Sequence, residues 1–253
     1  IDPVPEFMTT FYALAGERNF IKLYQDQFVY LKHRIEITNG LFLFGQADYR
    51  IREVQRNHTD AKLFNRKGRE YTSNIPENAA TENTQFKEFP VGDHTAFILK
   101  GTIVWQPGQK YMSRPDMKVV LDSKWPQLRL QYTKAIPGVL NSTANFDKIS
   151  FSISDDIALR LFGSTHYFVE LGTFLNTSRV HFMDFHHFNA NQISLIRDYK
   201  DGFLLMDYYQ PSTINNYIEV HVSHHFNGFL FNKIPGVRKL KLQAVLGVNF
   251  LYT

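Results

Sequence analysis

Apolar and polar side chains alternate along most of this chain with a period of two residues, and this alternation constrains the fold more than any other feature. Residues 29–37 carry apolar side chains at four of the odd positions and Tyr, Lys, Arg and Glu at the even positions. Because successive side chains on a β-strand point to opposite faces, the segment predicts a strand with one apolar and one polar face. The dipeptide Asn39-Gly40 follows, which is typical of a tight hairpin, and residues 45–52 resume the alternation.

The same pattern recurs to the end of the chain and predicts an all-β fold, an antiparallel meander of roughly ten strands. The predicted strands are residues 29–37, 45–52, 94–105, 127–133, 149–154, 157–161, 165–175, 202–209, 217–226 and 239–252. Helix signals are nearly absent, and the best candidate, residues 10–26, is interrupted by Gly16 and Asn19. Residues 57–93 are polar and aperiodic, so we expect one long surface loop there.

The composition limits the class of protein. Hydrophobic residues make up 43% of the 253 residues, which is enough to bury a core and excludes disorder as the main state. The 28 basic and 24 acidic residues are spread along the chain, so the net charge of +4 does not indicate a nucleic-acid partner. The absence of cysteine excludes disulfides, thiol nucleophiles and Cys-type zinc sites. Residues 1–7 precede Met8 and are interpreted as a segment left by cloning, and residues 8–253 as a single domain.

Strand length separates two architectures that share this alternation. Soluble sandwiches average strands of about 5–6 residues, whereas several strands here extend to about nine or more. Long strands with one apolar and one charged face favour a transmembrane β-barrel, in which the apolar face meets lipid and the charged face a wet lumen. A helical membrane protein is excluded, because no run of about 18 apolar residues is present. A soluble sandwich or lipocalin-like barrel has the same alternation and stays open as an alternative.

The barrel hypothesis assigns particular side chains to each face of the sheet. The side chains expected to face lipid, or an equivalent apolar surface, are Val29, Leu31, Ile35, Ile37, Ile149, Phe151 and Ile153. Those expected to face the lumen are Lys32, Arg34, Glu36, Asp48, Arg50 and Ser152. Aromatic residues near the predicted strand ends, among them Trp105, Trp125 and Tyr252, add modest support, since they are typical of interfacial girdles.

Several spaced segments resemble one family. They are residues 108–111 (GQKY), 114–116 (RPD), 145–150 (NFDKIS), 187–192 (HFNANQ), 225–235 (HFNGFLFNKIP) and 239–241 (KLK). In this order they are similar to an uncharacterised outer-membrane β-barrel family of Bacteroidota, in which the barrel follows a carboxypeptidase-regulatory-like domain. The resemblance runs from about Phe11 to the last residue and implies location and architecture, with no established reaction. Relative to full-length members, this chain lacks the regulatory-like domain and the last strands, so a partial barrel is expected.

The ten histidines raise the question of a metal site. Adjacent histidines on a strand point to opposite faces, so His186 cannot join His187 on one ion without an irregular backbone, and the same holds for His224 and His225. A cross-strand pair of His187 with His225 is the best remaining candidate, and the simpler interpretation is that the histidines face the lumen or the membrane interface. No metal or other cofactor is therefore predicted.

Other catalytic constellations are weak. Ser164 follows Gly163 without the further glycines of a nucleophile elbow, and Asp155 and Asp156 are adjacent near a predicted turn, where such residues usually bond to the local backbone. The basic residues 238–241 could bind phosphate-rich head groups, although cations that flank a turn are the simpler interpretation. We therefore expect no enzymatic activity.

The sequence leads to one main expectation for function. It predicts an outer-membrane β-barrel segment with a structural, transport or envelope-assembly role, in contact with outer-membrane lipid and possible envelope proteins. The alternative is a soluble extracytoplasmic β-barrel or sandwich whose aromatic side chains bind a small apolar or glycan ligand. A metal-dependent enzyme built on the histidine clusters is a distant third.

Overall fold

The computed structural model describes residues 6–16, 21–57, 61, 63–64, 71, 74, 92–121, 123–191, 202–204, 206, 208–209 and 211–253. The helix is α1 (Glu6–Gly16), and short 3-10 helices are η2 (Val139–Asn141), η3 (Arg160–Phe162), η4 (Phe182–Asp184), η5 (Phe231–Lys233) and η6 (Val237–Leu240). The strands are β1 (Tyr24–Thr38), β2 (Leu41–Val54), β3 (His94–Trp105), β4 (Lys110–Ser113), β5 (Lys118–Leu121), β6 (Gln127–Ala135), β7 (Asn145–Ala158), β8 (Ser164–Arg179), β9 (Ala190–Asn191), β10 (Phe203–Leu204), β11 (Tyr217–His225) and β12 (Val245–Tyr252).

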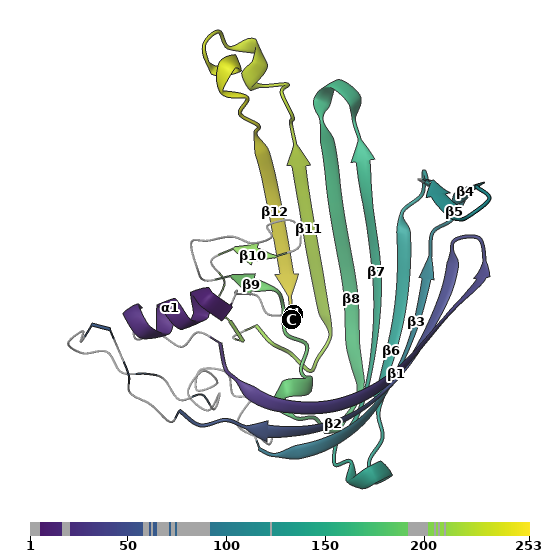
Figure 1. Ribbon diagram of the computed structural model, residues 1–253, viewed down its shortest axis with the longest axis vertical. Coiled ribbons are helices and arrows are strands. Elements are labelled where there is room, and N and C mark those ends of the chain that lie inside the picture. Colours follow the sequence, from purple (N-terminus) through teal and green to yellow (C-terminus); the bar gives the residue numbers. More distant parts are fainter. Residues whose placement is uncertain are drawn as a thin grey trace.

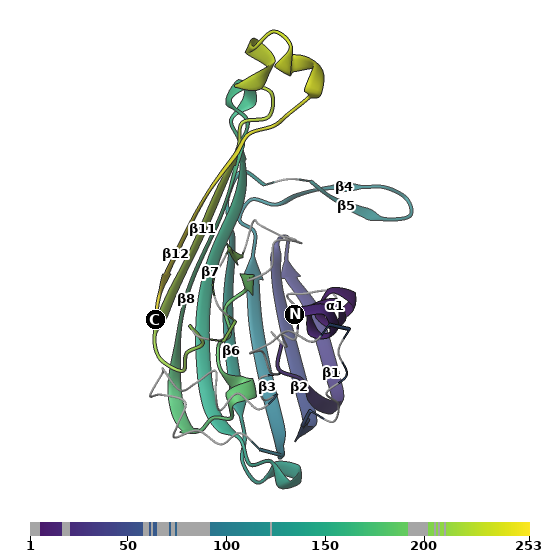
Figure 2. The ribbon, with the colours of Figure 1, turned by 90° about the vertical axis from the view of Figure 1, so that its left-hand side faces the viewer.

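One antiparallel sheet of eight strands dominates the described part of the chain, in the order β1-β2-β3-β6-β7-β8-β11-β12. The pairs β4-β5 and β9-β10 form two small separate sheets. Figures 1 and 2 show the main sheet as a curved wall, with α1 and the β9-β10 pair on its concave side. The predicted all-β antiparallel class is confirmed.

The two outermost strands of the sheet do not meet. Within the described residues, β1 pairs only with β2 and β12 only with β11. The sheet is therefore open, and the described residues form no closed barrel. The partial transmembrane barrel that the sequence suggested stays a prediction. No helix among the described residues is long and apolar enough to cross a membrane.

Several predicted elements need correction. The helix occupies Glu6–Gly16 and begins before residue 10, while Tyr24 already belongs to β1, because the alternation of β1 starts earlier than its apolar residues suggest. Residues 149–154 and 157–161 were predicted as two strands, yet β7 is continuous to Ala158 and residues 160–162 form η3. In residues 202–209, only Phe203–Leu204 is strand within the described positions.

The last predicted strand is also shorter than expected. Residues 239–252 were predicted as a strand, but η6 runs to Leu240 and β12 begins at Val245. Lys241 has φ of +50°, a left-handed conformation that a strand cannot contain. The hairpin of β4 and β5 was not predicted. Most of the predicted loop 57–93 lies outside the described residues.

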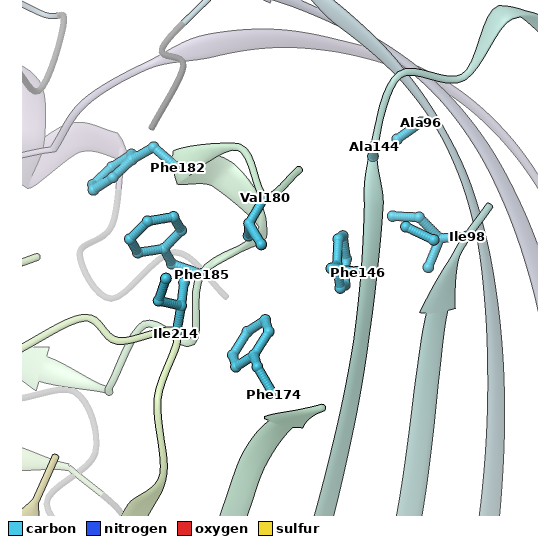
Figure 3. Packing of buried hydrophobic residues seen from close by; sticks show 10 residues of the cluster. Ala96, Ile98, Ala144, Phe146, Phe174, Val180, Phe182, Phe185 and Ile214 are labelled. Carbon is cyan, nitrogen blue, oxygen red and sulfur yellow. The ribbon is translucent and has the colours of Figure 1, made fainter. Parts of the chain in front are cut away.

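An apolar core joins the sheet to the chain that folds over its concave side. From the sheet come Ala96, Ile98, Ala135, Phe146 and Phe174, and from the segment that follows β8 come Val180, Phe182, Phe185 and Ile214, with Ala144 beside them. Figure 3 shows these side chains meeting between the two layers. Burial of apolar surface thus fixes residues 180–214, in the described positions, against the inner wall.

Candidate functional site: the concave face of the sheet

Charged and polar side chains of the main sheet gather on its concave face, beside the apolar core described above, whereas the convex face is apolar. The strand register places Lys32, Gln46 and Lys100 side by side, and residues of even number in β1, β2, β3 and β7 share that concave face. The side chains separate into two faces as predicted, with Lys32, Arg34, Glu36, Asp48, Arg50 and Ser152 on the concave face and Val29, Leu31, Ile35, Ile149, Phe151 and Ile153 on the convex face. Ile37 lies at an irregularity of the pairing between Glu36 and Thr38 and is 60% exposed. That the two faces meet a lumen and lipid stays a prediction.

Burial differs sharply between the two faces. Asp48 and His221 on the concave face are both 0% exposed, whereas Leu31 and Val248 on the convex face are 75% and 60% exposed. Folded proteins in water usually show the opposite arrangement, with charged side chains outside and large apolar side chains inside. The concave face is therefore the place where polar groups are concentrated and protected.

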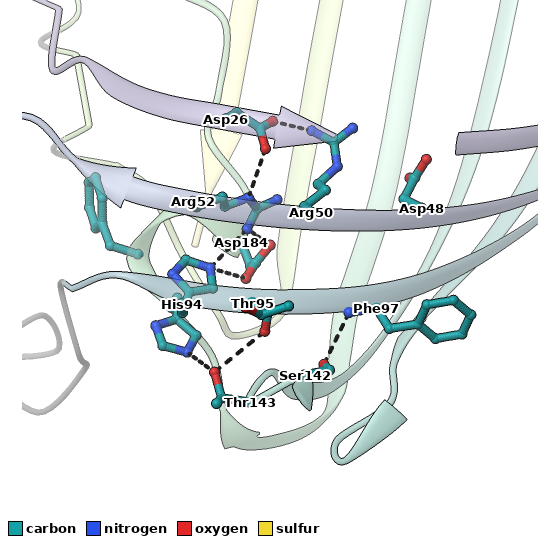
Figure 4. A network of polar contacts seen from close by, with 12 residues as sticks. Asp26, Asp48, Arg50, Arg52, His94, Thr95, Phe97, Ser142, Thr143 and Asp184 are labelled. Atoms are coloured by element: carbon teal, nitrogen blue, oxygen red, sulfur yellow. Dashed lines mark hydrogen bonds and ion pairs between the residues drawn. The ribbon is translucent and has the colours of Figure 1, made fainter. Parts of the chain in front are cut away.

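One polar cluster lies where the segment after β8 meets strands β1 to β3 (Figure 4). We call it the end cluster, and its members are Asp26, Arg52, His94, His181 and Asp184. Arg52 Nη1 donates to Asp184 Oδ1 at 2.6 Å, and both side chains are almost fully buried. Arg52 Nε also lies 4.0 Å from Asp26 Oδ1. Asp184 belongs to η4 and Arg52 to β2. This ion pair therefore joins the described residues between β8 and β11, which we call the inner segment, to the main sheet.

Two stacked imidazole rings complete the end cluster. The rings of His94 and His181 are 3.7 Å apart and nearly parallel. Burial, together with the neighbouring His94 and the cationic Arg179 and Arg52, lowers the pKa of His181 to about 4, against the opposing effect of Asp184. His181 is therefore neutral at pH 7, which allows the two rings to stack without charge repulsion.

A second group of polar side chains, the central cluster, comprises Lys148, Glu170, His186, Tyr217, Glu219 and His221. Lys148 Nζ donates to His186 Nδ1 at 2.7 Å, and the His186 ring stacks on Tyr217 with centroids 3.9 Å apart. Burial lowers the pKa of His186, and Lys148 adds to this, which favours a neutral ring that can accept from the ammonium group.

The remaining contacts of the central cluster lie within β11 and between β11 and its neighbours β8 and β12. Tyr217 donates its hydroxyl hydrogen to Glu170 Oε1 at 2.6 Å, and His221 Nε2 lies 2.7 Å from Glu219 Oε1. Asn249 Oδ1 is 2.9 Å from the other ring nitrogen of His221. These donors and acceptors bond to one another, so the cluster acts as an anchor between β7, β8, β11, β12 and the inner segment.

A glycine makes room for the central cluster. Gly172 lies directly opposite Tyr217 in the pairing of β8 with β11. A side chain at this position would overlap the Tyr217 ring, which covers the glycine. The absence of a side chain thus lets the ring lie flat against the wall, where it reaches both His186 and Glu170.

The structure does not bring His187 and His225 together. His186 stacks on Tyr217, the first residue of β11, and His187 lies 2.7 Å from Ser212 Oγ through its Nδ1. His225 is the last residue of that nine-residue strand, about 26 Å further along at the usual rise per residue. No group of three or more His, Asp or Glu side chains in the described part of the chain is arranged to hold a metal ion.

The other sequence candidates are also separate from one another. Asp156 forms an ion pair with His166 at 3.0 Å at the end of β7, near Asp155. Ser164 begins β8, and residues 238–241 lie in and after η6 at a turn far along the chain. The end and central clusters were missed by sequence reasoning, because their members come from distant segments. The only available signal was the placement of charged residues at concave positions.

The fold and this face define a class: an open antiparallel wall, apolar outside, with buried charge clusters inside and a folded segment packed against them. The sequence comparison gives the family. Residues 1–253 match the sequence model for the C-terminal domain of a family of unknown function, DUF5686, and the chain belongs to that family. No curated protein and no solved structure matches the chain.

Proposed function

We propose that this domain is the membrane-embedded wall of an outer-membrane β-barrel, with the concave face as part of a wet lumen and the described residues among 180–216 as a partial plug. The observation that carries the proposal is the inverted sheet, with apolar side chains exposed across the convex face and charged side chains buried on the concave face. Its role is structural or in transport or envelope assembly, in contact with outer-membrane lipid and envelope proteins, without catalysis.

The extent of the convex face supports this proposal. Exposed apolar side chains occur on this face of β1, β2, β3, β6, β7, β8, β11 and β12, among them Leu31, Leu43, Ile103, Leu130, Phe151, Leu171, Ile218 and Val248. Proteins in water rarely expose a contiguous apolar patch of more than a few hundred Å². A hydrocarbon surface removes the cost of that exposure.

Strand length and backbone bonding support it as well. β1, β2, β7 and β8 contain 15, 14, 14 and 16 residues, whereas about 9–11 residues suffice to cross a bilayer. Each inner strand bonds to a neighbour on both sides, as the hydrocarbon requires of every backbone amide. The proposal therefore requires that the free edges of β1 and β12 pair with further strands in the membrane. The Bacteroidota origin and the carboxypeptidase-regulatory-like context belong to the same proposal.

Site-directed spin labelling tests the proposal directly. The chain contains no cysteine, so a single introduced cysteine carries the only label. Leu130→Cys places it on the convex face, and Gln131→Cys, the next residue of β6, places a matched label on the concave face. After reconstitution into vesicles, we expect the label at 130 to collide with dissolved oxygen and to be shielded from a water-soluble nickel chelate.

The label at 131 is expected to show the reverse, with access to the nickel chelate. Equal access of the chelate to both positions would contradict the membrane proposal. A chain that is monodisperse in buffer without detergent, with position 130 open to the chelate, would instead support the soluble barrel or sandwich.

A further inference from the structure

A groove on the concave face lies outside both polar clusters. It has a volume of about 460 Å³ and is formed by β1, β2, β3 and β6. Four of its lining side chains are cations, Lys32, Arg34, Lys100 and Arg129, and we call this the cationic groove. Its volume falls in the range of small-molecule sites.

The charge of the cationic groove is not neutralised. No carboxylate is among its lining residues. Lys100 is paired with Asp48, whose Oδ2 lies 3.2 Å from Nζ. Within the described residues, no carboxylate lies within 4.0 Å of the charged groups of Lys32, Arg34 or Arg129. Three positive charges that share one concave wall create a positive potential, which attracts anions from solution.

Aromatic rings hold two of these cations in place. The Arg34 guanidinium lies 4.4 Å from the Phe42 ring centroid and 5.5 Å from that of Phe44. Lys32 Nζ is 5.0 Å from the centroid of Tyr30. A guanidinium that rests on a ring keeps its N–H edge free, and that edge matches a carboxylate or phosphate. The rings thus reduce the conformational entropy that binding an anion would cost.

The spacing of the cations indicates the size of the ligand. Lys32 pairs with Gln46, and Gln46 pairs with Lys100. The Cα atoms of the two lysines are therefore about 10 Å apart, across two strand spacings. Arg34 belongs to the next concave row, which continues through Phe44 and Thr102 to Gln131 on β6. Arg129 pairs with Val104 in the row beyond, so at least three strand spacings, about 14 Å, separate the backbones of Arg34 and Arg129. A single phosphate is too small to contact cations this far apart, so the spacing favours an anion with several charged groups. Thr102 and Gln131 add neutral hydrogen-bonding groups between them.

The other groove on this sheet is lined by residues of different charge. A second groove of about 420 Å³, over β6 to β8, is lined by Asp155, Asp156 and His166 and by several neutral polar residues. Its carboxylates repel anions. The two grooves therefore differ in the charge of their lining side chains, which include four cations in the groove over β1 to β6 and two carboxylates in the groove at the end of β7.

We propose that the cationic groove binds a small multivalent anion that carries phosphate or carboxylate groups, held by Arg34, Arg129 and Lys32. The inference goes beyond the proposed function and does not depend on it, since all the residues that form the groove belong to one sheet. A failure of membrane insertion would leave it unaffected.

Isothermal titration of the detergent-solubilised chain tests the inference, with pyrophosphate and citrate as separate probes. We expect saturable binding of one or both that weakens strongly with added salt. The Arg34→Gln/Arg129→Gln variant should bind at least tenfold more weakly, whereas Arg34→Lys/Arg129→Lys should retain part of the affinity. Tighter binding of pyrophosphate assigns phosphate as the preferred group, and tighter binding of citrate assigns carboxylate.

A matched control removes two cations elsewhere. Lys110→Gln/Arg114→Gln changes the net charge by the same amount, in the hairpin of β4 and β5, and should leave binding unchanged. Circular dichroism verifies that each variant retains its strand content. Absence of saturable binding of both probes would overturn the inference, and so would an equal loss of affinity in the control variant.

Discussion

The end cluster and the cationic groove lie on the same concave face, yet their charged side chains differ in burial and in pairing. In the end cluster, Arg52 and Asp184 are buried and joined at 2.6 Å, beneath the segment that follows β8. In the cationic groove, Lys32 and Arg34 are exposed and have no carboxylate partner among the described residues. Burial is tolerable for the first pair because each charge has a partner, and exposure is tolerable for the second because water solvates it.

This difference separates charges that hold the protein together from charges available to a ligand. A buried charge with a partner contributes to the fold, and its loss leaves the partner without solvation. An exposed cation beside others of the same sign contributes little to stability and lowers the free energy of a bound anion. Substitutions in the two regions should therefore affect different measurements.

The largest effect is expected from Asp184→Ala, which leaves Arg52 buried without its carboxylate. Removal of one member of a buried ion pair costs about 3–5 kcal/mol of unfolding free energy. Urea denaturation in detergent, followed by the fluorescence of Trp105 and Trp125, measures it. Glu36→Gln is the control, because it removes an exposed pair with Lys118 at 3.3 Å and should cause no measurable change. Equal urea denaturation midpoints for the two variants would show that the buried ion pair of the end cluster stabilises the fold no more than an exposed ion pair does.

The next largest effect is expected from Gly172→Ala. The added methyl group overlaps the Tyr217 ring, so the ring must move away from His186 and Glu170. Overpacking of this kind costs about 1–3 kcal/mol. Gly101→Ala is the matched control in β3, where a side chain would meet no atom within 4 Å. A destabilisation as large in Gly101→Ala would show that the effect arises from the strand backbone and not from Tyr217.

The pH dependence of stability comes from His181. Its pKa is about 4 in the folded chain and about 6.5 when unfolded, so the unfolded state binds more protons between these values. The stabilisation is complete above pH 6.5 and is lost as the pH falls toward 4. From pH 7 to pH 5 this single group should lower the unfolding free energy by about 2 kcal/mol.

Denaturation of the wild type and of His181→Gln at both pH values measures this contribution by difference. The variant should lose the part of the pH slope that His181 supplies, while the carboxylates contribute equally to both proteins. The groups that face His181 are His94, Asp184, Arg52 and Arg179. Identical slopes would mean that His181 is already protonated in the folded chain at pH 5.

The smallest effect on stability is expected from Arg34→Gln. The side chain is exposed and has no carboxylate partner in the described residues, so the unfolding free energy should change by less than about 0.5 kcal/mol. The affinity for pyrophosphate or citrate should fall in the same variant. A loss of stability comparable to that of Asp184→Ala would show that the groove also holds the fold together.

The elements with unbroken alternation were predicted best. Residues 94–105 match β3 at both ends, and residues 217–226 match β11 within one residue. Alternation is a local property, since it depends only on the direction of successive side chains. The prediction failed where alternating residues adopt other backbone conformations, as at residues 239–241, where a 3-10 turn and a left-handed Lys241 precede β12.

The polar clusters could not be predicted, because their members are distant in the chain. Arg52 and Asp184 are separated by 132 positions, and Tyr217 and Glu170 by 47. The sequence also suggested His187 and His225 as a cross-strand pair, although His187 lies in the segment before β9, beside Ser212, and His225 is the last residue of β11. Which histidines meet is decided by the register of β8, β11 and the inner segment.

The sequence by itself determined the class of fold and the face on which each strand residue lies, because a period of two assigns sides without reference to other strands. Only the tertiary structure decided which charges are buried in pairs and which line an open groove. The physical reason is that charge interactions depend on separation and on solvent exposure in three dimensions. Both are set by the strand register and by the packing of the described residues among 180–216 against the concave face of the sheet.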